Sequence, residues 1–527
     1  MARTAALALA FLALMAGPAQ ATTFAVVVVP GFTLADLDRA AGLGAVGLLN
    51  PGAGPETSAA LAEASLVRGE VRNSLRGGAP GGPPLVTPET GELGSAGGPA
   101  IYVGLPQGGL QPNDRRYPIL VVGPGYEGLL TSESTRIPGL VSIADVAPTA
   151  LDRDGALGSD PADDAAGELR ALDERIDENN EARLPATVLV CALVLLLALV
   201  LPAAAVPGLA AALAANVALG LAGVSGLWTV LVVLGAATVL GGPLLARLLR
   251  TPLALGLALT AVVGAYLLAL ALDGAAVALS PFGPTQNSRY YGLSNLLETL
   301  LLVPALAGAA LLRLSLGWVA FAVAALLAFV TVAGNRFGAD GGGAVVLATG
   351  FAVLAVLLAG GSRRALAVAV AAALALTFGL AAIDAATGGS SHVTRALEDG
   401  PAGLAGDLAG RIELSWQRAT SSWGAALAVA ALLAVFVALA VRTLRRPGPL
   451  GERAVPLALA AALLASLVVN DSPVDVLLVG VTCYVAVEAG MLPTRWRVFS
   501  SSPSPSWPSS WRPAAAARRQ PPPTPRR

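Results

Sequence analysis

The apolar stretch PATVLVCALVLLLALVLPAAAV (residues 185–206) decides the fold, because it runs for 22 residues without a charged side chain. A helix of about 20 apolar residues crosses the hydrocarbon layer of a membrane with its backbone hydrogen bonds satisfied. Further stretches of this kind lie at residues 208–225, 226–243, 252–272, 296–312, 315–333, 343–361, 365–386, 423–441, 454–470 and 475–493. The sequence therefore predicts a mainly α fold, with a polytopic helical membrane domain of about 11 spans over residues 185–497.

The composition of the whole chain agrees with a membrane protein. Of its 527 residues, 55% are hydrophobic and 13% are charged, and the net charge is −1. An ordinary soluble domain has about 25% charged residues, so soluble globular, disordered and nucleic-acid-binding proteins are all disfavoured. One His and two Cys are too few for most structural zinc sites or a disulfide framework. We expect the lipid bilayer as a partner, and we expect no nucleic acid, metal or cofactor.

The N-terminal segment has the pattern of a signal peptide. Arg3 supplies a positive charge, residues 5–16 are apolar, and Ala19 and Ala21 are the small residues of a signal-peptidase site. An uncleaved transmembrane helix is the alternative, but the apolar run is short beside the roughly 20 residues that a span needs. The pattern predicts a cleaved signal peptide at residues 1–21 and export of the segment that follows.

Residues 22–159 are expected to form a small extracytoplasmic α/β domain. The continuous apolar runs at residues 24–29 and 119–122 are typical of strands that are buried on both faces of a sheet. Residues 32–49 have a pattern that is helical in part. The acidic residues 160–184 predict a solvated helical stalk that leads into the membrane.

Two segments of this domain carry a family resemblance. PILVVGPGY (residues 118–126) followed by GLVSIADVAPT (residues 139–149) resembles the closing segment of alkaline-phosphatase-superfamily domains, and the strand at residues 24–29 resembles their first strand. The resemblance implies an α/β domain related to metal-dependent enzymes that cleave phosphate or sulfate esters.

The sequence departs from that family where its catalytic metal is held. Pro30 and Gly31 stand where family members place a metal-binding aspartate, and the exported block contains no His. Thr57 and Ser58 are the candidates for a nucleophile, without a metal-binding constellation beside them. The sequence therefore favours a degenerate, shortened domain with a binding, scaffold or accessory role, and a metal-dependent phosphohydrolase is an alternative.

The distribution of arginine predicts the topology. With the α/β domain outside, alternation of the spans brings most loop arginines to the cytoplasmic side, among them Arg247, Arg313, Arg363 and Arg446. Most acidic loop residues then lie outside. We expect a plasma-membrane protein with an extracytoplasmic N-terminal domain and a disordered, cytoplasmic Ser/Pro/Arg-rich tail at residues 498–527.

This topology places three polar loops on the outer face of the membrane. The candidate substrate-binding residues in them are Arg289, Tyr291, Asn295, Arg336, Asp340 and Arg395, and His392 is the candidate general base. Arginine suits the bidentate capture of phosphate or carboxylate, and imidazole suits proton transfer near neutral pH. These residues predict an outward-facing cavity, and the first loop leads into Glu298 at the start of a span.

The same loops have a structural interpretation. Arginines near a membrane surface pair with lipid phosphates, and tyrosines there are common interfacial residues. Two functions stay open beside the phosphohydrolase. One is a binding, scaffold or accessory protein of the cell envelope. The other is an enzyme or transporter that acts on lipid-linked glycans or phosphorylated head groups at the outer leaflet, with anionic lipid or a lipid-linked glycan as its ligand.

Overall fold

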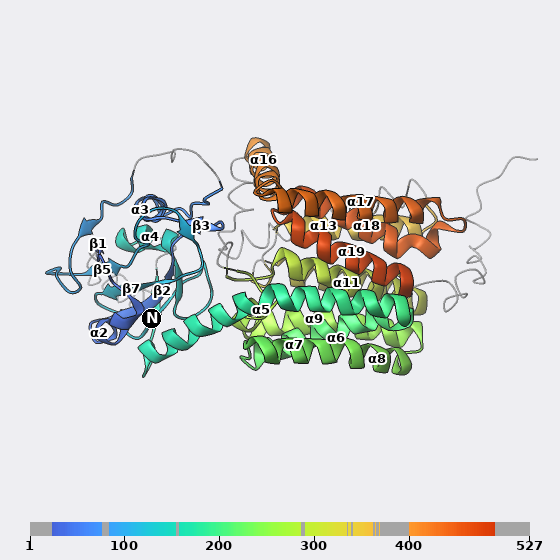
Figure 1. Cartoon of the computed structure of the whole chain (residues 1–527), viewed down its shortest axis with the longest axis horizontal. Helices are drawn as coiled ribbons and strands as arrows, with labels where there is room; N and C mark the ends of the chain where they lie inside the picture. Colours follow the sequence, from blue (N-terminus) through green and yellow to red (C-terminus); the bar gives the residue numbers. More distant parts are fainter. Residues whose placement is uncertain are drawn as a thin grey trace, which may run out of the picture. The chain divides into compact units, whose positions relative to one another are not determined.

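The computed structural model describes residues 24–75, 84–153, 157–285, 290–334, 336–338, 341–361, 364, 368, 371 and 400–490. Within these residues the chain forms an N-terminal α/β region followed by a helical region (Figure 1). The predicted signal peptide at residues 1–21 and the predicted tail at residues 498–527 lie outside the described residues.

A mixed sheet forms the centre of the α/β region. Its strands are β1 (Ala25–Val28), β2 (Ala45–Asn50), β4 (Glu89–Thr90), β5 (Ala100–Val103), β7 (Tyr117–Val122), β8 (Leu129–Thr131), β9 (Leu140–Ser142) and β10 (Gly158–Asp160). Their order is β10-β8-β2-β7-β5-β1-β4, and β9 also pairs with β2. β1 is parallel to β4 and β5, whereas β7 is antiparallel to both of its neighbours. A separate pair joins β3 (Glu56–Thr57) to β6 (Gln111–Pro112).

Both faces of the sheet are covered, as the apolar runs predict. One face packs on α3 (Ala59–Arg68) and α4 (Val146–Ala150), and the other packs on α2 (Leu37–Ala41) and α5 (Ala165–Val200). Each face has its own hydrophobic core, and alternate residues of one strand point into different cores. Ile101 of β5 lies in the core beneath α3 and α4, and Tyr102 lies in the core beneath α2 and α5. The strands expected at residues 24–29 and 119–122 are confirmed as β1 and β7.

The interpretation of residues 32–49 as partly helical is right only for their first half. The short 3-10 helix Leu34–Asp36 and α2 form there, but Ala45–Asn50 is the buried strand β2. Gly42 ends α2. Gly44 lies close to β7, because a Cβ on Gly44 would be 2.3 Å from the carbonyl oxygen of Val121. The apolar run that follows these glycines is short, so its periodicity does not distinguish a helix from a buried strand.

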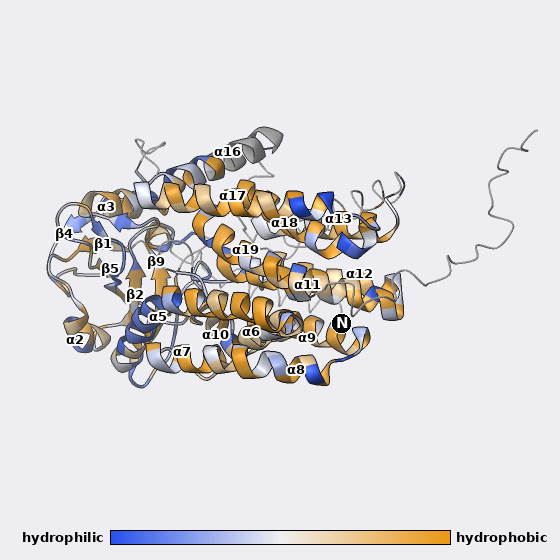
Figure 2. Cartoon of the chain, turned by 45° about the vertical axis from the view of Figure 1, so that its right-hand side comes forward, coloured by the Kyte–Doolittle hydropathy of each residue, from blue (hydrophilic) through white to orange (hydrophobic). Residues whose placement is uncertain are grey.

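The helical region contains nine helices, among the described residues, that are long and apolar enough to span a membrane. They cover Ala165–Val200 (α5), Pro202–Leu221 (ending in α6, Ala205–Leu221), Leu227–Leu248 (α7, Leu227–Ala236, to α8, Gly242–Leu248), Pro252–Leu272 (α9), Asn295–Leu316 (α11), Gly341–Leu358 (α13), Trp423–Arg445 (α17), Leu450–Val469 (ending in α18, Ala454–Val469) and Pro473–Gly490 (α19). Three shorter or less apolar helices are α10 (Gly274–Ala278), α12 (Trp318–Ala333) and α16 (Gly400–Ala419). Figure 2 shows apolar residues along most of these helices.

These helices support a multi-pass membrane protein. The predicted stretch 365–386 lies outside the described residues apart from residues 368 and 371, and the stretch 315–333 falls on the shorter helix α12. α5 continues without a break from the acidic residues into the apolar stretch, with Pro185 inside the helix. Its first half is not solvated on all sides, because Leu169 and Ile176 are buried against the sheet.

Candidate functional site

The structure places some of the predicted site residues. Arg289, Asp340, His392 and Arg395 lie outside the described residues, whereas Tyr291, Asn295 and Arg336 are described. The first two polar loops meet through their backbones: the Leu293 N–H donates to the carbonyl oxygen of Gly338 at 3.1 Å. Arg336 is exposed in the turn that ends at Gly338. Two of the three predicted loops are therefore in contact.

Gly292 allows this contact, and its replacement by alanine should break it. Its φ is +76°, and an added Cβ would lie 2.0 Å from the Gly338 carbonyl oxygen. We expect Gly292→Ala to lower the thermal unfolding midpoint of the purified protein by more than Gly108→Ala. Gly108 has a similar φ of +82° but open space around it, so that control measures only the backbone strain of about 1 kcal/mol. Equal midpoints for the two variants would contradict the proposed contact.

Tyr291 and Asn295 each have protein partners. The guanidinium carbon of Arg136, from the α/β region, lies 4.5 Å from the centre of the Tyr291 ring. Asn295, the first residue of α11, donates from Nδ2 to Asp471 Oδ1 at 3.1 Å. Arg418 of α16 forms an ion pair with Asp471 at 3.1 Å. These contacts give Tyr291 and Asn295 structural roles between elements that are distant in the sequence.

One turn further along α11 lies a buried carboxyl group that is not among the predicted site residues. Glu298 is 1% exposed, and its Oε2 accepts a hydrogen bond from Asn470 Nδ2 at 3.0 Å. Asn470 Nδ2 also donates to Ser466 Oγ at 2.8 Å. We call Glu298, Ser466 and Asn470 the Glu298 cluster. An ionisable side chain buried in a membrane domain is costly, so it commonly marks a functional site.

The start of α13 lies against this carboxyl group. A Cβ on Gly343 would lie 3.2 Å from the carboxyl carbon of Glu298. Glu298 is in the first turn of α11, and Gly343 is in the first turn of α13. The positive ends of two helix dipoles therefore favour a negative charge at this position. Glu298 could have been found from the sequence as a carboxylate inside an apolar stretch, but Asn470 follows 172 residues later and has no local signal.

A half-buried acidic residue, Glu488, lies near the C-terminal end of α19. Glu488 accepts a hydrogen bond at Oε1 from Thr443 Oγ1 at 2.9 Å, and its Oε2 lies 3.6 Å from Arg446. The hydroxyl of Tyr484 donates to Thr443 at 2.7 Å. This network joins α17 to α19 and gives Glu488 a packing role.

The Asp145–Thr149 segment, on which the predicted family resemblance rests, has a structural role in the α/β region. Asp145 is buried and accepts hydrogen bonds from Ser132 Oγ at 2.6 Å, Ser134 Oγ at 2.6 Å and the Ser142 N–H at 3.1 Å. The Thr149 hydroxyl donates to the Asp145 carbonyl at 2.6 Å. Burial raises the pKa of the Asp145 carboxyl above its ordinary value, although these hydrogen bonds favour the carboxylate.

The candidate nucleophiles are also engaged or buried. Ser58 Oγ accepts a hydrogen bond from the Leu61 N–H at 3.2 Å and so caps α3, while Thr57 is 3% exposed. Gly31 forms a turn directly after β1 with a φ of +77°. Among the described residues, no group of three or more His, Cys, Asp or Glu side chains is placed to hold a metal ion.

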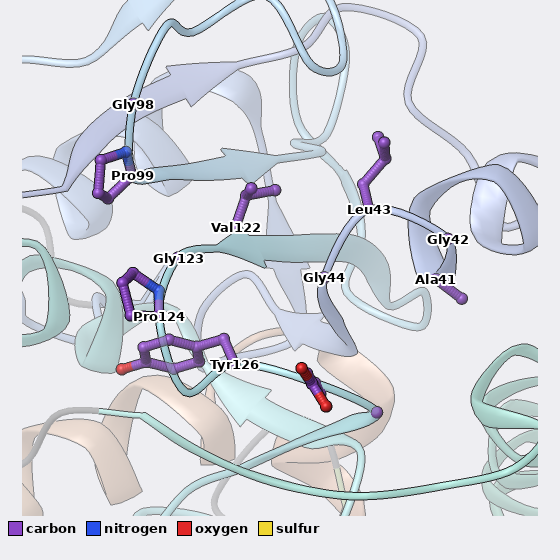
Figure 3. Close-up of a pocket in the computed structure, with 12 residues that line it drawn as sticks. Ala41, Gly42, Leu43, Gly44, Gly98, Pro99, Val122, Gly123, Pro124 and Tyr126 are labelled. Carbon is purple, nitrogen blue, oxygen red and sulfur yellow. The ribbon is translucent and has the colours of Figure 1, made fainter.

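A hollow of about 640 Å³ lies at one edge of the sheet (Figure 3). It is lined mainly by glycine, proline and apolar residues from the end of β7, such as Gly123 and Pro124, and from the segments before β2 and β5, such as Gly44 and Pro99. Ligands of α/β sheets usually bind outside the carboxyl ends of parallel strands. This hollow lies at the edge where β1 and β5 begin, so it is not the catalytic cleft that the family resemblance implies.

The chain matches no family model, no curated protein and no solved structure.

Proposed function

We propose that the chain is an integral membrane protein of the cell envelope with a binding, scaffold or accessory role, carried by a degenerate and shortened alkaline-phosphatase-like domain. The positions of β1, β7 and the Asp145–Thr149 segment support the resemblance. Asp145 holds the Ser132 and Ser134 hydroxyls at the start of α4, and Ser58 caps the start of α3. These structural roles support a domain that binds without catalysing hydrolysis.

One observation carries this proposal: the α/β domain is fastened to the helix that enters the membrane domain. Arg116, next to β7, donates from Nε to Asp173 of α5 at 2.6 Å and forms an ion pair with Asp177 at 2.7 Å. The exposed fraction of the Arg116 side chain is 1%. A domain held in this way can present a partner-binding surface at a fixed place above the membrane.

The proposal includes an arrangement of the chain in the membrane. A cleaved signal peptide, about 11 spans, an extracytoplasmic α/β domain and a cytoplasmic C-terminus are supported by the arginine distribution and by the apolar stretches. The plasma membrane is the proposed location.

The Glu298 cluster favours a second candidate function. An enzyme or transporter for lipid-linked glycans or phosphorylated head groups would use a buried carboxyl group on a central helix to bind a substrate or to move a proton. The contact between Leu293 and Gly338 brings two of the polar loops together near the start of α11. Arg289, Arg336, Asp340, His392 and Arg395 are the proposed substrate contacts of this alternative, with His392 as the general base.

A complementation experiment distinguishes the two functions. The gene is deleted, the envelope lipids and glycans are profiled, and the altered profile is compared after complementation with each variant. We expect Glu298→Gln and His392→Ala to restore the profile as fully as wild type, because a scaffold needs neither group. The glutamine keeps an oxygen that can accept from Asn470.

Glu174→Gln is the matched control, because Glu174 is exposed on α5. Arg116→Ala, which removes the contact between the domain and α5, should fail to restore the profile. Failure of Glu298→Gln or His392→Ala at wild-type protein levels, with success of Glu174→Gln, would reject the scaffold role and favour the enzyme or transporter.

A further inference from the structure

One face of α5 carries two arginines and an asparagine where the helix passes from the α/β region into the membrane domain. Arg175, Asn179 and Arg183 are spaced by four residues, so they lie along the same side of the helix. All three donate to one segment: Asn179 Nδ2 to the Leu279 carbonyl at 2.8 Å, Arg175 to the same oxygen at 3.4 Å, and Arg183 to the Gly283 carbonyl. We call these three residues the α5 polar face.

The two guanidinium groups have no carboxylate within ion-pair distance in the described part of the chain. Asp273 and Asp475 are the acidic residues whose charges act on Arg175 and Arg183, respectively. The Asp273 carboxylate instead caps α10, accepting from the Ala275 N–H at 3.0 Å and the Ala276 N–H at 3.3 Å. Partly buried cations without a carboxylate in direct contact are costly, so this face favours the binding of an anion.

Two polar atoms of the same face are buried without a hydrogen-bond partner in the described structure. They are Arg175 Nε, which is a donor, and Asn179 Oδ1, which is an acceptor. Asn179 is 7% exposed, and its Nδ2 already donates to two carbonyl oxygens, so the orientation of the amide is fixed. A ligand that satisfies both atoms needs an acceptor and a donor, as in a phosphate group with a nearby hydroxyl.

The position along α5 indicates where such a ligand comes from. Arg183 is the last charged residue before the uncharged apolar residues 184–200. It therefore lies where a spanning helix leaves the hydrocarbon layer, which is the level of the phospholipid head groups. Arginine binds phosphate oxygens in a bidentate manner.

We propose that Arg175, Asn179 and Arg183 bind the phosphate and a hydroxyl of an anionic phospholipid head group in the leaflet on the side of the α/β domain. The two arginines hold the phosphate oxygens, and Asn179 Oδ1 accepts from the hydroxyl. This site depends neither on the scaffold role nor on the Glu298 cluster.

The test uses the full chain, purified and placed in lipid nanodiscs that contain phosphatidylglycerol and phosphatidylcholine. Native mass spectrometry then counts the lipids that remain bound. We expect wild type to retain phosphatidylglycerol in preference to phosphatidylcholine. The double variant Arg175→Gln/Arg183→Gln should bind phosphatidylglycerol about 25-fold more weakly, at about fivefold per arginine.

The matched control is Arg153→Gln/Arg170→Gln, which removes the same charge from arginines outside the α5 polar face. Its affinity should stay within about twofold of wild type. Equal retention by the two double variants would overturn the proposal. So would an absence of lipid preference in wild type, which does not depend on the folding of any variant. Displacement of the lipid by inorganic phosphate alone would also overturn it and would indicate a free phosphate site.

Discussion

Arg116→Ala should lower the free energy of unfolding by about 3 kcal/mol, because it leaves the half-buried carboxylate of Asp173 without its counter-charge. The Arg116 side chain is 1% exposed and the Asp173 side chain is 17% exposed, with 2.6 Å between their charged atoms. The expected loss lies at the lower end for buried ion pairs, because the second partner, Asp177, is 59% exposed.

The measurement combines thermal unfolding with limited proteolysis of the protein in nanodiscs. Arg170→Ala is the matched control, because Arg170 also joins α5 to the α/β domain, through Asp38 at 2.5 Å, but the two side chains are 44% and 72% exposed. We expect faster cleavage between the α/β domain and α5 in Arg116→Ala and no measurable change in Arg170→Ala. If both variants unfolded and were cleaved like wild type, Arg116 would not fasten the domain.

The helical architecture could be predicted because spanning helices have a strong local signal. Residues 252–272 and 296–312 are each apolar over about the length that a span requires, and each falls on one helix of the structure. The predicted stretch 185–206 is divided between two helices, because α5 ends at Val200 and Pro202 begins the next one. The strand β2 was missed because Ala45–Asn50 is short, and its burial comes from pairing with β7 in the distant residues Tyr117–Val122. Acidic residues likewise dominate the sequence at 160–184, so the apolar face of α5 that packs on the sheet could not be recognised there.

The candidate site was harder to predict, because its contacts join distant parts of the chain. The sequence predicts Asn295 as a substrate contact, but its amide donates to Asp471, which lies 176 residues away. The partners of Glu298 come from the end of α18 and the start of α13. The sequence contains the residue types of these contacts but no pattern that pairs them. The contact between the Tyr291 and Arg336 loops agrees with the predicted grouping of two loops.

Asp145→Ala should destabilise the α/β domain by about 2–4 kcal/mol, because it removes the acceptor of two buried donors. These donors are the Ser132 hydroxyl and the Ser142 N–H, whereas Ser134 is exposed and can bond to water instead. Asp145→Asn should cost less, since its amide oxygen can still accept a hydrogen bond. Thermal unfolding midpoints of the two variants and wild type measure the difference.

The pH dependence gives a sharper test of the same residue. Because burial raises the folded-state pKa of Asp145 above the unfolded value, the folded state holds the proton more tightly. The stabilisation by this bound proton is complete below the pKa of the unfolded state, about 3.9. It is lost as the pH rises through the pKa of the folded state. Wild type should therefore lose stability relative to Asp145→Asn over this range. A gain over the same range would show that the three hydrogen bonds outweigh desolvation. Ser134→Ala removes one of these bonds to the carboxylate, so it should move the loss to higher pH.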